Sequence, residues 1–220
     1  MCLLGGVRLG YVTRLRDGLK MLTSLEVLHQ VVVMSGCIAE ELGHLTQLRV
    51  LDVKVTLSAS DDDEWTTCSE ALLESLGKLT KIKKVLRFFF NSNIASLDGS
   101  MTGQLGNLCR LSITNVTVVP KWIRRACLPV LSNLKIVVWQ EQRDDIQVLG
   151  FLPCLRHLIF NVREGVVERC AVGAEAFQRA VSCEFNIEGA GAGTGVLPCM
   201  FPRGAMPMLQ DYGAITECGR

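Results

Sequence analysis

The chain has 220 residues, of which 49% are hydrophobic and 20% charged, a balance that is typical of an ordered chain and excludes wholesale disorder. Its 23 basic residues nearly balance its 22 acidic ones, so no global field is available to hold nucleic acid or an anionic membrane surface. No run of about 18 apolar residues occurs, and residues 1–10 lack the charged lead and cleavage site of a secretion signal. We therefore expect a cytoplasmic protein without a membrane span.

One short phrase recurs along the chain. Residues 22–28 read LTSLEVL and residues 45–51 read LTQLRVL, the same pattern displaced by 23 residues. Four further copies follow, and the third apolar anchors of the six copies are Leu28, Leu51, Val85, Leu111, Leu134 and Leu158. Two weaker copies have their third anchors at Cys183 and Tyr212.

The spacing within the phrase changes from three residues to two, as in Leu45, Leu48, Leu51 and Val53. A spacing of three suits a turning segment, whereas a spacing of two suits a short strand with alternate residues buried. No single unit can bury its apolar edge, so the units are expected to stack. The pattern predicts an α/β fold, a leucine-rich-repeat solenoid with a curved parallel sheet on its concave side and irregular helices and turns on its convex side.

The predicted repeat domain spans residues 1–188 with about seven repeats, and residues 189–220 form a Gly- and Pro-containing tail with one possible degenerate repeat. A longer step of 34 residues between Leu51 and Val85 contains an insert at 58–70, with four acidic residues at 61–64, which we place on a loop. The exact repeat boundaries near residues 85–114 stay open, because the Leu-Gly-x-Leu phrase at Leu105 is shifted by three residues relative to the other copies.

The alternation of each predicted strand also predicts a binding surface. If the third and fourth anchors point inward, the residues between and just after them face the concave side, where this architecture binds proteins. The predicted protein-binding residues are His29, Val31, Asp52, Lys54, Leu86, Phe88, Ser112, Thr114, Lys135, Val137, Ile159 and Asn161.

Motifs for catalysis, metals and cofactors were weighed against simpler interpretations. The ten cysteines are never closer than 13 residues, so we expect free thiols used as small buried hydrophobes rather than a zinc site or a disulfide framework. The glycine-rich segment 189–195 runs into prolines instead of a helix and is interpreted as a loop, not a phosphate site. We expect no enzyme activity, no cofactor and no metal.

Basic residues gather locally at 78–87 and at 121–125. A solvated face is the simplest interpretation. Contact with an acidic protein surface is the next one, and it is favoured over nucleic acid because no aromatic residues alternate with the charges.

Four phrases carry a resemblance to a known family: residues 15–28 (LRDGLKMLTSLEVL), 41–53 (ELGHLTQLRVLDV), 119–123 (VPKWI) and 145–155 (DIQVLGFLPCL). With them the chain resembles the C-terminal repeat region of grass intracellular immune receptors, the coiled-coil nucleotide-binding leucine-rich-repeat disease resistance proteins. The resemblance covers residues of about 15 to 160. The nucleotide switch of such receptors is not encoded here, because Gly77 and Lys78 are followed by Leu79 where a phosphate loop needs Ser or Thr.

The resemblance implies a module for plant defence and innate immunity that recognises an effector or holds the receptor inactive. Its protein partner would be a pathogen effector, a guarded host protein or the receptor's own nucleotide-binding domain. Two alternatives stay open: the substrate-receptor repeat arm of a ubiquitin ligase, and a truncated, non-functional receptor fragment.

Overall fold

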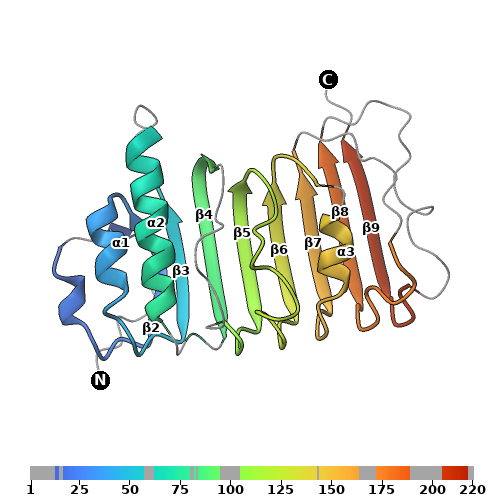
Figure 1. Cartoon of the computed structure of the whole chain (residues 1–220), viewed down its shortest axis with the longest axis horizontal. Helices are drawn as coiled ribbons and strands as arrows, with labels where there is room; N and C mark the ends of the chain where they lie inside the picture. Colours follow the sequence, from blue (N-terminus) through green and yellow to red (C-terminus); the bar gives the residue numbers. More distant parts are fainter. Residues whose placement is uncertain are drawn as a thin grey trace.

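The computed structural model describes residues 13–14, 17–56, 62–79, 82, 84–94, 105–142, 144–163, 172–188 and 205–217. Within these residues, nine strands form one parallel sheet in which sequential strands are neighbours throughout (Figure 1). The helices lie on one face of this sheet (Figure 1). The predicted α/β repeat solenoid is therefore confirmed.

The strands follow one another at the predicted repeats. They are β1 (Thr13–Arg14), β2 (Val27–Val33), β3 (Val50–Val55), β4 (Val85–Ile94), β5 (Arg110–Val116), β6 (Asn133–Val138), β7 (His157–Val162), β8 (Ser182–Glu188) and β9 (Asp211–Glu217). The helical elements are η1 (Leu19–Met21), α1 (Gly36–Leu42), α2 (Asp62–Lys78) and α3 (Asp145–Gly150). No helix in the described part of the chain combines the length and the apolar character that crossing a bilayer requires.

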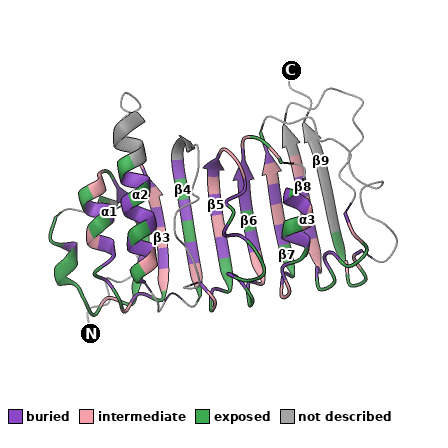
Figure 2. Ribbon diagram, viewed as in Figure 1, coloured by how far each residue is buried: buried purple, intermediate pink, exposed green. Residues whose placement is uncertain are grey.

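The core lies between the sheet and the helical face, and it is built from rows of matching anchors. Register pairing aligns the third anchors of successive strands, and the aligned residues are buried: Leu28, Leu51, Leu86, Leu111, Leu134, Leu158 and Cys183. A second buried row holds larger side chains towards the C-terminal end: Val31, Val53, Phe88, Ile113, Ile136, Phe160 and Phe185. Alternate strand residues thus enter one continuous core, seen as purple bands in Figure 2.

Backbone hydrogen bonds also join neighbouring repeats where the strands begin. Arg49 N donates to Glu26 O at 2.8 Å, and Arg110 N donates to Lys84 O at 2.9 Å. Equivalent bonds join Arg156 N to Ser132 O at 2.9 Å and Gln210 N to Val181 O at 2.9 Å. Each repeat is therefore tied to the preceding one at its turn as well as along its strand.

The insert at 58–70 differs from the prediction. Its described part, from Asp62 onward, is the first half of helix α2 rather than a loop. The physical reason is an apolar spacing of four residues, which buries Cys68, Leu72 and Leu76 on one face of the helix. Helix α2 packs against α1, where the hydroxyl of Ser75 donates to Glu40 O at 3.2 Å.

Three of the residues predicted for the concave surface lie in the core instead. Leu86 and Phe88 are buried because an additional residue separates the second anchor, Ile82, from the third anchor, which is Leu86 and not Val85. Val31 is buried because the register of β2 shifts between Leu28 and Val31, where Gln30 takes a left-handed φ of 53°.

Candidate functional site

The sheet face opposite the helices is covered by no element in the described part of the chain; we call it the open face. Its side chains form three rows across the strands. The first row contains Val27, Val50, Val85, Arg110, Asn133, His157 and Ser182. The second contains Asp52, Arg87, Ser112, Lys135, Ile159 and Glu184, and the third contains Val32, Lys54, Phe89, Thr114, Val137, Asn161 and Asn186.

The structure places nine of the predicted surface residues on this face: His29, Asp52, Lys54, Ser112, Thr114, Lys135, Val137, Ile159 and Asn161. Val137 shares a row with Thr114 and Asn161 but is only 8% exposed. The face is continuous across the strands, so these residues lie on one surface.

Other residues of the open face were missed by the sequence reasoning. Arg87 and Phe89 occupy the places assigned to Leu86 and Phe88. Arg110, Asn133 and His157 each lie directly before a third anchor and face the same side. The sequence did contain the signal for Arg110, Asn133 and His157, because strand alternation also assigns the residue before the third anchor to the open face.

Charged residues at the β2–β4 end of the open face pair with one another. The carboxylate of Asp52 lies 3.2 Å from His29 Nε2 and 3.5 Å from an Arg87 guanidinium nitrogen. The Lys54 ammonium lies 5.3 Å from the centroid of the Phe89 ring, a cation–π distance. At the other end, the Asn186 amide donates to Glu184 Oε1 at 2.7 Å and to Asn161 Oδ1 at 3.1 Å.

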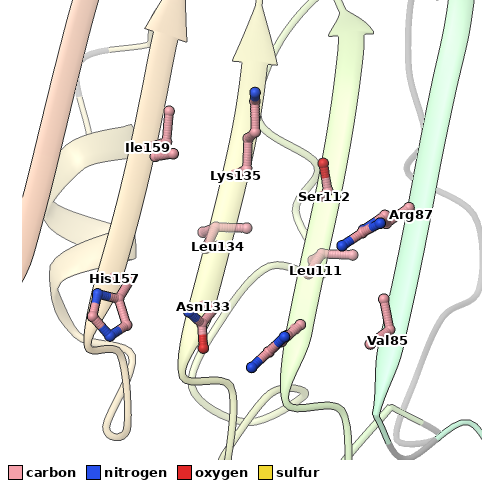
Figure 3. A pocket seen from close by; sticks show the side chains of 10 residues that line it. Val85, Arg87, Leu111, Ser112, Asn133, Leu134, Lys135, His157 and Ile159 are labelled. Carbon is pink, nitrogen blue, oxygen red and sulfur yellow. The ribbon is translucent and has the colours of Figure 1, made fainter. Parts of the chain in front are cut away.

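Between these two ends lies a shallow depression of about 540 Å³ over β4 to β7 (Figure 3); we call it the central depression. Ser112 lies between Arg87 and Lys135 in the second row (Figure 3). Arg110, Asn133 and His157 of the first row also line the central depression, and no carboxylate of the described residues does. The central depression is therefore the most basic part of the open face.

Two carboxyl groups with raised pKa values lie away from the open face, near the start of α3. Burial and the neighbouring Asp145 raise the pKa of Glu141 to about 7. Burial also raises the pKa of Asp145 to about 6, against the hydrogen bond that it accepts from Gln142 N at 2.8 Å. No cluster of three or more metal-ligating residues occurs in the described residues.

The described cysteines fit the expected use only in part. Cys68, Cys127 and Cys183 are buried, and burial raises the pKa of the Cys183 thiol to about 12. Such a thiol stays protonated and serves as a small apolar group. Cys37 and Cys109, by contrast, are exposed.

A family model described as "Leucine-rich repeat region" matches residues 1–217. No curated protein matches the chain. Repeat regions of this kind are protein-interaction modules, because stacked repeats present a broad continuous sheet to a partner.

Proposed function

Since the chain belongs to the leucine-rich repeat family, we propose that it is the protein-binding repeat module of a plant intracellular coiled-coil nucleotide-binding disease resistance protein. In this proposal the module acts in the cytoplasm, in the defence response. It binds a pathogen effector, a guarded host protein or the receptor's own nucleotide-binding domain. The resistance-protein phrases at 119–123 and 145–155 support this assignment beyond the leucine pattern alone.

The open face is the observation that carries the proposal. It extends over the successive strands from β2 to β8, and within the described residues nothing covers it. A protein surface can contact several strands at once there, because neighbouring strands lie only about 4.8 Å apart. The polar and charged side chains of the open face are accessible to a partner and supply specificity, whereas the buried side chains of the core are not accessible.

The module is proposed to act by binding and not by catalysis. The contacts between polar side chains at the two ends of the open face, in the Asp52 and Asn186 clusters, are charge pairs and amide hydrogen bonds. These contacts stabilise a surface. They do not pair a nucleophile with a general base in the way that acyl or phosphoryl transfer needs.

Sequencing of full-length transcripts from the source tissue tests the assignment to resistance proteins. The proposal expects the reading frame to continue upstream into a module with a Gly-x-x-x-x-Gly-Lys-Ser/Thr phosphate loop. A transcript that instead joins the repeats to the adaptor-binding helices of a ubiquitin ligase receptor would contradict it.

A further inference from the structure

The central depression differs from the rest of the open face in its charge and in its shape. From this difference we infer that it is the specificity site for a short acidic segment of the partner protein, a cluster of two or three Asp or Glu side chains. The inference rests on the proposed protein-binding function of the open face. It specifies which chemical groups of the partner contact one position on that face.

Long and short side chains alternate around the central depression. In the second row, Ser112 is flanked by Arg87 on β4 and Lys135 on β6. In the first row, Asn133 is flanked by Arg110 on β5 and His157 on β7. The short residues leave the hollow, and the long basic residues border it, as Figure 3 shows for Arg87, Ser112 and Lys135.

This arrangement places hydrogen-bond donors at the floor and positive charges at the rim. The Ser112 hydroxyl and the Asn133 amide NH₂ group are both hydrogen-bond donors. Arg87 and Lys135 are about 9.6 Å apart at their backbones, two strand spacings. A carboxylate seated over Ser112 would thus be within reach of both long side chains.

The positive charges at the rim are largely uncompensated. Arg110 and Lys135 are exposed, and neither forms an ion pair with another residue in the described part of the chain. Arg87 shares Asp52 with His29. Because no carboxylate of the described residues lines the central depression, an acidic partner group would be attracted to Arg110 and Lys135 without displacing an existing ion pair of either residue.

The acidic residues on either side favour a short acidic protein segment over nucleic acid. Asp52 on β3 and Glu184 on β8 bound the basic zone in the same row. The zone from β4 to β7 is three strand spacings wide, about 14 Å, which matches about four residues of extended peptide. A longer nucleic-acid backbone, with a negative charge at every nucleotide, would run onto Asp52 or Glu184.

The test measures binding of fluorescein-labelled tetraglutamate to the full chain by fluorescence anisotropy, in 50 mM and 300 mM NaCl, about threefold below and twofold above physiological ionic strength. Arg110→Glu combined with Lys135→Glu should raise the dissociation constant about tenfold or more, since two attractive contacts become repulsive. The matched control is Arg124→Glu with Arg125→Glu, which makes the same charge change at two exposed residues of the β5–β6 connection. It should change binding less than about twofold.

Circular dichroism melting of both double variants separates binding from folding, because all four residues are exposed. An equal loss of tetraglutamate affinity in the two double variants would overturn the inference. The absence of saturable tetraglutamate binding to the wild type would also overturn it. Tighter binding of a ten-nucleotide single-stranded RNA through Arg110 and Lys135 would overturn it as well. If a partner protein engages the open face but the Arg110 and Lys135 changes leave its affinity unaltered, the inference fails while the proposed function stands.

Discussion

At the scale of single residues, the two carboxyl groups near the start of α3 are held where their charge is disfavoured. Glu141 Oε2 is buried without a hydrogen-bond partner in the described residues, and its pKa is raised to about 7. The folded chain therefore binds a proton at this site at pH values where the unfolded chain, with an ordinary pKa of 4.5, has released it. The free energy of unfolding must fall as the pH rises through this window.

The first prediction is that Glu141→Gln removes this part of the pH dependence. Below pH 4.5 the wild-type group is neutral in both states, so the neutral amide gives no electrostatic advantage; above about pH 7 the wild type carries the buried charge. The variant should therefore gain stability relative to wild type between pH 4.5 and 7. Urea unfolding at pH 5 and pH 8 measures the gain, with Glu175→Gln at an exposed site as the control.

If the difference in unfolding free energy between Glu141→Gln and wild type were the same at pH 5 and pH 8, the assigned environment of Glu141 would be wrong. Glu175→Gln makes the same substitution at an exposed position, so an equal gain in both variants would also contradict the assignment.

At the scale of elements, α3 is fixed to the following repeat by a close approach at its last residue. The Gly150 carbonyl accepts a hydrogen bond from Phe177 N at 2.8 Å. A Cβ at Gly150 would lie 2.7 Å from Ala176 Cβ and 2.8 Å from Phe177 Cε2. These distances are shorter than carbon atoms tolerate, so the packing requires a residue without a side chain.

The second prediction is that Gly150→Ala destabilises the chain by about 1–3 kcal/mol through overpacking. The matched control is Gly77→Ala in α2, where an added Cβ meets no atom within 4 Å. The free energy of unfolding of the control should not decrease, and it should increase by up to about 0.5–1 kcal/mol because alanine has a higher helix propensity than glycine. Thermal melting of both variants distinguishes them, and an unchanged melting temperature for Gly150→Ala would contradict the close approach.

The sequence pattern was sufficient to predict the positions of the repeats, but it did not predict the local shifts in strand register. Periodic leucines located the strands, because burial of alternate residues leaves a visible spacing. The additional residue before Leu86 and the left-handed Gln30 each shift the register by a local backbone choice, which hydrophobicity does not encode. The consequence was confined to Val31, Leu86 and Phe88, since the next anchor restores the register.

The helix at 62–78 was missed for a different reason. The acidic run at 61–64 was interpreted as a solvated loop, but three of its residues, Asp62, Asp63 and Glu64, begin the helix, where acidic side chains stabilise the first turn. The spacing of Cys68, Leu72 and Leu76 was available and outweighs the acidic start. The central depression could not be predicted at all, because it depends on which long and short side chains the register brings side by side.

At the scale of the whole molecule, the stack of repeats buries one face of the sheet in the core, and we propose that the other face binds a partner. The leucine anchors and the helices form one continuous core on one side. The ladder bonds before and along the strands connect each repeat to the next. No element of the described part of the chain covers the open face, and its charges are arranged with a basic centre between Asp52 and Glu184.

Site-specific photo-crosslinking of the full chain in plant cells tests the central claim most directly. A benzophenone side chain is placed at Ser112 or Asn161 on the open face, and at Arg125 in the β5–β6 connection, whose Trp122 and Ile123 face the core from the opposite side. We predict a covalent protein adduct from Ser112 and Asn161 and none from Arg125. Adducts from Arg125 with none from the two open-face positions would contradict the account.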